Sequence, residues 1–519
     1  MGVVRMRWIA LHLPLLSLES FAATLPPEAG TKPLALMDRH SVLSANAAAR
    51  ALGVTPGLKR ATALALAPQL TLGQADACRD ARSLMAVAHA ALAFTPVVAL
   101  EPAEDVGGAP HTVLLEVQAS LRCFGGLAGL QQRLQQALSP LGHRVHTVSA
   151  CTALGAAWLS RAHAQRHCED LAATRAALAA LPLSVLGPAS EHVSVLHSMG
   201  LRTLADLHTV PRDGLARRVG PELLDNLDRA LGTQPDPRVF VTLAPVFDSQ
   251  VELFARADTT EPLMHAAGWL LERLVAWLSA QHALVRRFAL VMRHEQGSRR
   301  AAPVPPATTL EIALAEPSRD SAHLRALLHE RLAQLQLPAP TLELRLQAHD
   351  VSRRAPPNQE LFPTPHSEQE GLTRLIERLQ ARLGADQVQR LMPLQDHRPE
   401  RASAWRVADA QIRVHPPRRA AHAAAPGPAP PVVPGSRPVW LLASPEPLHE
   451  RDGAPMLDGQ PLQLLSGAER IEAGWWDGAP AQRDYFMAQL PGGALVWIYR
   501  ARLPASDAQQ GWYLQGRFG

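Results

Sequence analysis

The residues SANAAARALGVTPGL, Ser44–Leu58, carry the most specific pattern in this 519-residue chain. Alanines lead into Arg50, and Gly53 followed by Pro56–Gly57 marks a helix end and a turn. The next run, Lys59–Leu66, again has the spacing of a helix. The stretch therefore predicts a small helical cap with one cation, Arg50, at its edge.

Composition and charge are typical of a globular protein, with a length that allows about three or four domains. The hydrophobic fraction is 47%, the net charge is +4 and the pI is about 9.1. All of the 51 basic residues are Arg except Lys32 and Lys59. Arg suits phosphate binding, but codon bias in a GC-rich genome gives the same excess, so both interpretations stay open.

The cysteines and the N-terminus favour a reducing, cytoplasmic setting. No Cys-x-x-Cys spacing occurs, which argues against zinc and disulfides; the four cysteines are Cys78, Cys123, Cys151 and Cys168. The apolar run Trp8–Leu18 is interrupted by His12 and Pro14 and is too short to span a bilayer. We therefore expect a cytoplasmic protein with no cofactor and no structural metal.

Strand-like and helix-like runs alternate through the first third of the chain. Trp8–Leu13 predicts a buried strand, and Val97–Glu101 and Thr112–Val117 predict two paired strands. Ala81–Ala93 and Thr152–Arg161 have helical spacing. Such alternation indicates an α/β layer.

The stretch around Arg50 resembles the fingers of Y-family (translesion) DNA polymerases, and its matching residues are Asn46, Ala49, Arg50, Gly53 and Val54. In that family a Tyr and the Arg contact the triphosphate of the incoming nucleotide. Here Ala47 replaces the Tyr. The resemblance implies a conserved framework with Arg50 as the residual nucleotide contact.

The resemblance extends along the chain and implies an α+β multidomain fold: a right hand of palm, fingers, helix-hairpin-helix thumb and little finger, plus a small β-rich C-terminal module. The expected bounds are 1–20 and 72–166 for the palm, 21–71 for the fingers, 167–234 for the thumb, 238–350 for the little finger, 355–395 for a clamp-motif segment and helix, 420–438 for a Pro/Ala linker and 439–519 for the module.

Two of these parts should bind DNA without sequence preference. Short helices with Gly turns after residue 183 have helix-hairpin-helix texture, in which backbone N–H groups approach a phosphate. A β-α-β-β-α-β order follows, as in the little finger. The expected DNA contacts are Gly200, Arg202, Thr203, Arg217, Arg218, Arg256, Arg286, Arg287 and Arg293.

The residues that would hold two Mg²⁺ ions in a Y-family palm are largely missing. The two Asp positions of the first strand fall at about Ala10 and His12, and only a later family acid, Glu19, is matched. At the second site Glu101 keeps one acid and Pro102 replaces the other. The family's triphosphate-binding Lys position is Ala156. We therefore expect no catalysis of phosphoryl transfer.

A segment just past the little finger is similar to peptides that bind the sliding clamp, in which a Gln and two apolar anchors dock into a groove. It reads Asn-Gln-Glu-Leu-Phe, and its candidate contacts are Gln359, Leu361 and Phe362. Flanking prolines should keep it extended. Gln460–Leu465 is a weaker competitor.

The last 81 residues hold half of the Trp residues and all three Tyr. Arg470–Gly478 and Arg483–Phe486 are similar to a branch of Y-family-like proteins that lack catalysis and act as scaffolds of a bacterial damage-inducible mutagenesis complex. This similarity implies three partners besides DNA: the sliding clamp, a RecA-like protein and an error-prone C-family polymerase. The candidate partner-binding residues are Trp475, Trp476, Asp477, Tyr485, Phe486 and Trp497. The alternative for each aromatic residue is the core of a small sheet.

Two other functions compete with a scaffold. A weakly active Y-family polymerase could use Glu101, Glu104 or Asp105 for metal, although the last two precede a Gly-Gly pair as in a solvated turn. A helical DNA-repair adaptor unrelated to polymerases would leave the fingers and C-terminal patterns unexplained.

Overall fold

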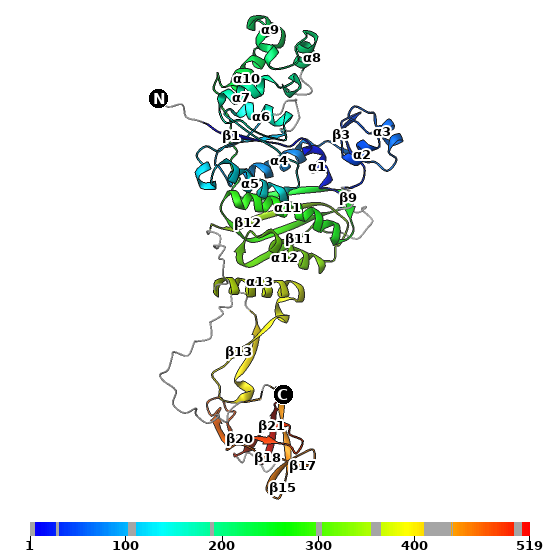
Figure 1. Cartoon of the computed structure of the whole chain (residues 1–519). Coiled ribbons are helices and arrows are strands. Elements are labelled where there is room, and N and C mark those ends of the chain that lie inside the picture. The colour runs from blue at the N-terminus through cyan, green and yellow to red at the C-terminus, as the bar shows by residue number, and fades with distance from the viewer. Residues whose placement is uncertain are drawn as a thin grey trace. The chain divides into compact units, whose positions relative to one another are not determined.

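The computed structural model describes residues 6–26, 31–101, 111–186, 191–296, 304–353, 365–408, 437–438, 440–502 and 511–518. The chain divides into two compact units, Met1–Phe362 and Pro363–Gly519 (Figure 1). Within the described ranges, none of the helices has the length and apolar character needed to cross a membrane.

The palm is a five-stranded sheet of order β5-β6-β1-β7-β8. Its strands are β1 (Trp8–His12), β5 (Val98–Leu100), β6 (Thr112–Glu116), β7 (His146–Ala150) and β8 (Gln165–His167). β1 is antiparallel to both of its neighbours, β6 and β7. The strands expected from the apolar runs are confirmed to within a few residues.

Both faces of the palm sheet are covered by helices, which explains why β1 is apolar at almost every position. Ile9 and Leu11 pack into one core with the helices α1 (Leu16–Ala22), α4 (Ala77–Leu92) and α5 (Leu127–Leu138). Two short 3-10 helices, η2 (Leu121–Phe124) and η3 (Ser139–Leu141), add residues to the same core. Trp8 and Ala10 pack into a second core with α6 (Ala153–Ala162) and the thumb. Figure 1 shows these two helical layers on opposite sides of the sheet.

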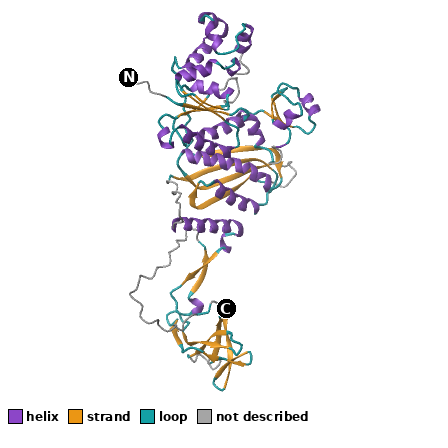
Figure 2. Ribbon diagram, viewed as in Figure 1, coloured by secondary structure: helices purple, strands orange, loops and turns teal. Residues whose placement is uncertain are grey.

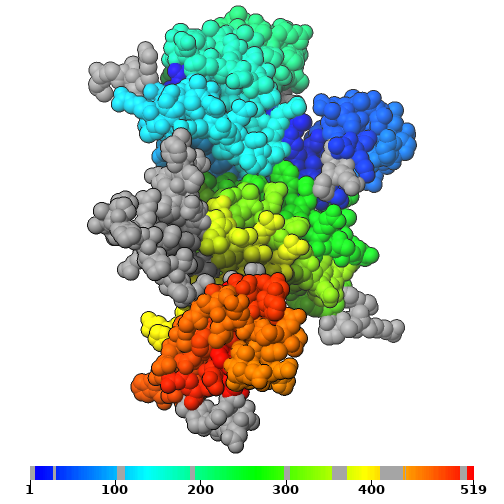
Figure 3. Space-filling view, turned by 60° about the horizontal axis from the view of Figure 1, so that its bottom comes forward, coloured from blue at the N-terminus to red at the C-terminus, as the bar shows by residue number. Residues whose placement is uncertain are grey.

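The fingers are a three-stranded sheet of order β3-β2-β4 with two short helices. Their elements are β2 (Leu34–Met37), β3 (Val42–Ala45), α2 (Ala47–Ala51), α3 (Arg60–Leu66) and β4 (Thr71–Gln74). A small core of their own, which includes Met37, Ala49 and Val54, holds them together. In the space-filling view they form the blue lobe at the side of the first unit (Figure 3).

The thumb is a bundle of short helices joined by tight turns. It consists of α7 (Leu171–Ala179), η4 (Leu183–Leu186), α8 (Glu191–Ser198), η5 (Ala205–Thr209), α9 (Arg212–Val219) and α10 (Pro221–Leu231). Gly200 and Gly220 have φ values of 84° and 82°, which L-residues with a side chain rarely adopt. These are the turns that the helix-hairpin-helix texture predicted.

The little finger has the expected β-α-β-β-α-β order, and its sheet has the strand order β11-β10-β12-β9. Its elements are β9 (Phe247–Ala257), α11 (Thr260–Ala280), β10 (Leu284–His294), β11 (Ala307–Ser318), α12 (Ser321–Ala333) and β12 (Thr341–Ser352). Phe288, Leu290 and Leu346 point to the buried side of the sheet.

The little finger is joined to the palm by more than its connecting segment. In that segment Val241 N donates to Val98 O at 2.8 Å, which extends the edge of the palm sheet. α11 packs against α4. The rings of Phe21 and Phe254 meet edge to face with centroids 5.3 Å apart. The arrangement therefore depends on contacts between residues far apart in sequence.

The second unit begins with α13 (Pro365–Leu383), η6 (Ala385–Gln387) and a two-stranded hairpin whose strands are joined through η7 (Pro399–Arg401). The hairpin strands are β13 (Gln389–Pro393) and β14 (Ser403–Val407), which the sequence did not predict. The module that follows is a sheet, and its described residues, 440–502 and 511–518, contain no helix (Figure 2). Its strands are β15 (Trp440–Arg451), β16 (Ala454–Leu457), β17 (Gln460–Pro461), β18 (Gln463–Leu464), β19 (Glu469–Ala473), β20 (Ala481–Gln489), β21 (Leu495–Ala501) and β22 (Trp512–Arg517). Residues 420–436 of the expected linker lie outside the described residues.

Candidate functional site

The central strand of the palm holds no acid where the resemblance implies two. Ala10 lies opposite Leu114 of β6 and is completely buried in the core shared with α6. His12 lies opposite Thr112, and its Nδ1 is 3.0 Å from Thr112 Oγ1. A methyl group and a hydrogen-bonded imidazole therefore occupy these two positions.

His12 is electrically neutral at ordinary pH. Burial above all, together with the nearby Arg161, His111 and His146, lowers the pKa of His12 to about 3. Burial also lowers the pKa of His111. Neutral imidazoles supply none of the negative charge that attracts Mg²⁺, a cation that prefers oxygen ligands.

Glu101, at the end of β5, is the one acid at the second family position, and it is already paired. Its side chain is buried, and Oε1 accepts a hydrogen bond from Arg161 Nη2 at 3.0 Å. Arg161 also donates to the carbonyl of Val185 in η4 of the thumb. The pair therefore compensates the carboxylate charge and connects the palm to the thumb.

Of the remaining acids near the palm, the structure gives the interactions of Glu19. Glu19 accepts from Arg144 N at 3.1 Å and lies 3.3 Å from His143 Nδ1, so it holds a loop. Pro102, Glu104 and Asp105 lie outside the described residues. In the part of the chain that the structure describes, no three His, Cys, Asp or Glu side chains gather as metal ligands.

In the fingers, the matching residues divide into a structural residue and a surface cation. Asn46 caps α2, because its Oδ1 accepts from Ala49 N at 2.9 Å and from Leu34 N at 3.1 Å. Ala47 and Arg50 are exposed on that helix. The triphosphate-lysine position, Ala156, is fully buried on α6 of the palm.

The thumb hairpin at Gly200 is held by one acid, which accepts from two backbone N–H groups of the turn. Asp206 Oδ2 accepts from Arg202 N at 2.7 Å and from Thr203 N at 2.8 Å, and these hydrogen bonds lower the pKa of Asp206. No atom lies within 4 Å of a Cβ added at Gly200. Among the other predicted contacts here, Arg217 and Arg218 are exposed at the end of α9.

The four little-finger arginines predicted to bind DNA are all exposed, but two are already in ion pairs. Arg256 Nη1 lies 3.3 Å from Glu295 Oε2, and Arg293 Nη1 lies 3.0 Å from Glu343 Oε2. Arg286 and Arg287 lie together on β10. The net positive charge of this face is thus smaller than the count of arginines suggests.

The predicted clamp contacts Gln359, Leu361 and Phe362 lie outside the described residues. The competing segment is described: Gln460 begins β17, Gln463–Leu464 forms β18, and Leu464 and Leu465 are 41% and 43% exposed. Its strand pairing makes it part of the module sheet rather than a free extended peptide.

The assignment of Tyr485 and Trp497 to a docking face is corrected by their burial. They are 1% and 4% exposed, and their rings stack with centroids 4.1 Å apart. Phe486 is half-buried and packs on Trp512. Cross-strand aromatic pairs of this kind form the core of a small sheet.

Trp475 and Trp476 are the exposed aromatic residues of the Arg470–Gly478 motif, at 80% and 54% exposure. Their rings meet edge to face at 5.4 Å. They stand in the turn between β19 and β20, immediately before Asp477. These two residues therefore keep the properties of a candidate partner-binding surface.

Asp477 is not free to receive a cation from a partner, because Arg398 and Arg401 of the second unit already bind it. Its carboxylate accepts two hydrogen bonds from Arg398, at 3.0 and 2.6 Å, and one from Arg401 at 2.6 Å. These contacts lower the pKa of Asp477 to about 2. Arg398 also bonds Asp396 and lies over the Trp476 ring. Asp477 thus fixes the turn between β19 and β20 that carries Trp475 and Trp476.

Sequence reasoning missed Arg161 and Arg398, since nothing local to either residue indicates a partner 60 or 79 positions away. It also missed the exposed Leu391 and Trp405, which face each other across β13 and β14 at 55% and 68% exposure. The alternation of apolar residues in both strands was the available signal.

Comparison with known proteins gives one relative along nearly the whole chain. Protein ImuB of Caulobacter vibrioides, from strain NA1000 / CB15N and identically from strain ATCC 19089 / CIP 103742 / CB 15, is 28% identical over 489 residues, which are 90% of this chain and 100% of that protein. No family model matches the chain. Among solved structures, DinB from Sulfolobus solfataricus is 15% identical over 67% of this chain and 99% of its own, at a TM-score of 0.37. An insertion ternary complex of Dbh DNA polymerase is 15% identical over 67% of this chain and 100% of its own, at a TM-score of 0.36.

Proposed function

We propose that this protein is a non-catalytic, DNA-binding scaffold for damage-induced translesion synthesis and DNA repair, as its similarity to ImuB implies. In this proposal it links the sliding clamp to an error-prone C-family DNA polymerase and also binds the RecA-like protein ImuA. It acts in the cytoplasm, at the nucleoid.

The observation that carries the proposal is the charge in the palm. Two Mg²⁺ ions need several carboxylates around them, whereas the described palm positions offer a buried Ala10, a neutral His12 and a Glu101 already paired with Arg161. These three residues therefore leave no free carboxylate for the metal ions that neutralise the charge developing in phosphoryl transfer. In a non-catalytic protein of this kind, the function depends on the regions that bind DNA and partner proteins.

DNA binding is assigned to the thumb and little finger. The exposed Arg202, Arg217 and Arg218 of the thumb suit phosphates, which are contacted without sequence preference. Gly200→Val should weaken binding, because Val is disfavoured at a φ of 84°. Affinity should fall steeply with salt as counterions are released. Salt-insensitive DNA binding, or none, would contradict this assignment.

The clamp is assigned to the segment that contains Leu361 and Phe362, and the polymerase and ImuA to the C-terminal module. An exposed Trp475 on a turn fixed by Asp477 supports the second assignment, because rigid aromatic residues are common binding hot spots.

The test is a reconstituted bypass reaction with the sliding clamp, the C-family polymerase, ImuA and a lesion-bearing template. Full-length protein should raise bypass by the polymerase, and the chain lacking 439–519 should bind DNA and clamp but give no increase. Pull-down of both partners at an undiminished level by the truncated chain would move recruitment into the polymerase-like body.

A weakly active polymerase remains the second candidate, because the acids Glu104 and Asp105 follow Glu101 by three and four positions in sequence. It differs from the scaffold in one measurable property, template-dependent primer extension without another polymerase.

A further inference from the structure

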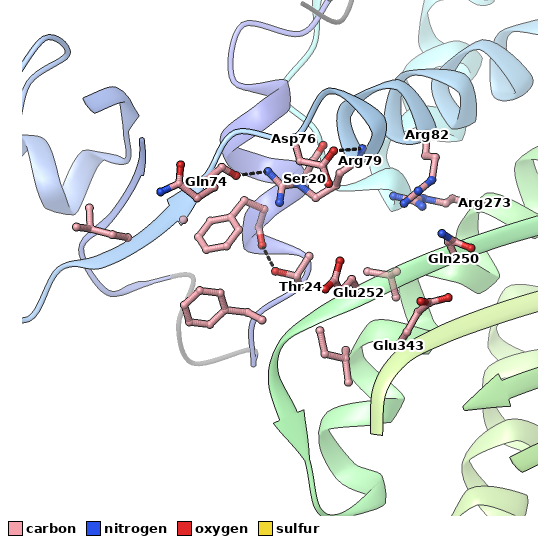
Figure 4. Close-up of a pocket in the computed structure, with 16 residues that line it drawn as sticks. Ser20, Thr24, Gln74, Asp76, Arg79, Arg82, Gln250, Glu252, Arg273 and Glu343 are labelled. Carbon is pink, nitrogen blue, oxygen red and sulfur yellow. Dashed lines mark hydrogen bonds between the residues drawn. The ribbon is translucent and has the colours of Figure 1, made fainter. Parts of the chain in front are cut away.

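A cavity of about 370 Å³ lies in the first unit between α1, β4 and α4 on one side and β9 and α11 on the other. Figure 4 shows Arg79 and Arg82 entering it from α4 and Arg273 from α11. It is separate from the palm centre, since neither His12 nor Glu101 lines it.

Arg273 is a buried cation whose neighbours carry no compensating charge. Its side chain is 9% exposed, and its guanidinium donates to Ser83 Oγ at 3.0 Å and Ser249 Oγ at 3.3 Å. Among the described residues it forms no ion pair. Burial, with the added effect of Arg82, lowers the pKa of Arg273 to about 10.

A second guanidinium adds to this charge. The head groups of Arg82 and Arg273 lie next to each other in Figure 4, and Arg82 also has no ion pair within the described ranges. Two adjacent buried or half-buried cations repel, and a buried charge is costly unless an opposite charge and hydrogen bonds compensate it. The positive charge of Arg82 and Arg273 is therefore not balanced by an anion among the described residues.

The acids on the cavity wall do not supply that anion. Asp76 caps α4 by accepting from Cys78 N and Arg79 N. Glu343 pairs with Arg293 at 3.0 Å. Glu252 is exposed, and its negative charge interacts electrostatically with Arg79. Each of these carboxylates thus interacts with a group other than Arg82 or Arg273. The two guanidinium groups can therefore bind an anionic ligand.

We propose that this cavity binds a phosphate-bearing anion between Arg82 and Arg273. Planar guanidinium groups match phosphate oxygens in pairs, and the volume falls in the range of small-ligand pockets. Phe254 also lines the cavity and is 51% exposed, so its ring gives a surface for an apolar or aromatic remainder of the ligand. The phosphate source is a free nucleotide or the DNA backbone.

The bound anion would also join two parts of the molecule. Arg82 and Ser83 belong to the palm helix α4, and Arg273 and Ser249 belong to the little finger. A phosphate that contacts both arginines stabilises their contact by mass action. This inference does not depend on the scaffold function.

The test measures binding of inorganic phosphate, dAMP and deoxyadenosine to the full chain, at an ionic strength held constant with chloride. Phosphate and dAMP should bind saturably and raise the thermal unfolding temperature, whereas deoxyadenosine should not. Arg82→Gln should weaken dAMP binding about tenfold or more, since it removes charge-assisted hydrogen bonds. Arg451→Gln, the same change at a 79% exposed side chain, is the matched control.

Arg273→Lys is the companion variant, because it keeps the charge and loses the planar fork; it should also weaken dAMP binding. Absence of saturable phosphate binding, or equal affinities in Arg82→Gln and Arg451→Gln, would overturn the proposal. A short single-stranded DNA separates the sources. Arg82→Gln weakens DNA binding if the backbone supplies the phosphate, and leaves it unchanged if a free nucleotide does.

Discussion

The ion pair between Glu101 and Arg161 gives a quantitative prediction, because the resemblance to Y-family polymerases implies a catalytic acid at Glu101 and the structure pairs that residue with Arg161. The side chains are 7% and 16% exposed. Breaking a fully buried pair costs about 3–5 kcal/mol, and the partial exposure of Arg161 reduces this to about 2–3 kcal/mol for Glu101→Ala. Arg161→Ala should cost a similar amount because Glu101 is then buried alone.

The double variant should cost less than the sum of the two singles, with a coupling free energy of about 1–3 kcal/mol. Urea unfolding followed by Trp fluorescence is a suitable assay, since Trp8 and Trp158 are buried in the core that includes α6, the helix that carries Arg161. With a slope of about 2 kcal/mol per M, each single change moves the first transition by about 1 M.

Arg293→Ala is the matched control for these variants. The Arg293–Glu343 pair has a similar N–O distance of 3.0 Å, but its Arg side chain is 66% exposed, so its loss should cost at most about 1 kcal/mol. If Glu101→Ala and Arg161→Ala shift the midpoint no more than this control does, and their effects add, the pair is not the structural contact described here.

Three further predictions concern the clamp, the module and acid stability. Replacing Leu361 and Phe362 with Ala should abolish clamp binding in a pull-down and leave DNA binding intact; undiminished clamp binding rules the segment out. Trp475→Ala should lose partner capture with an unchanged melting curve, whereas Trp497→Ala should unfold the module because that ring is in its core; the reverse pattern would contradict the assignment. The pKa of His12 is about 3 when folded and about 6.5 when unfolded, so the unfolded chain binds more protons between these values and stability should decrease as pH falls from 6.5 towards 3. Thermal melts of His12→Gln at pH 7.5 and 5 should show a smaller decrease than those of the unchanged chain, and an equal decrease would refute this role.

The larger elements could be predicted from the sequence because their patterns are local. The apolar β1, the order of the little-finger elements and the turn at Gly200 follow from periodicity and from glycine. The β13–β14 hairpin was missed, because its short alternating runs lie in a Pro- and Arg-rich segment that looks like a tail.

Side-chain placement was harder to predict, since it depends on contacts between distant residues. The sequence could not show that Tyr485 and Trp497 are buried while Trp475 is exposed, because all three lie in aromatic runs. Nor could it show that Arg273 on α11 reaches Ser83 on α4, 190 positions away. Such contacts are set by the packing of whole elements.

The central claim, that this chain is not itself a polymerase, is tested most directly by primer extension. Purified protein is incubated with a primed template, the four dNTPs and either Mg²⁺ or Mn²⁺. We predict extension no greater than in the reaction without protein. Extension that copurifies with the chain and is abolished by Glu101→Gln would contradict the claim.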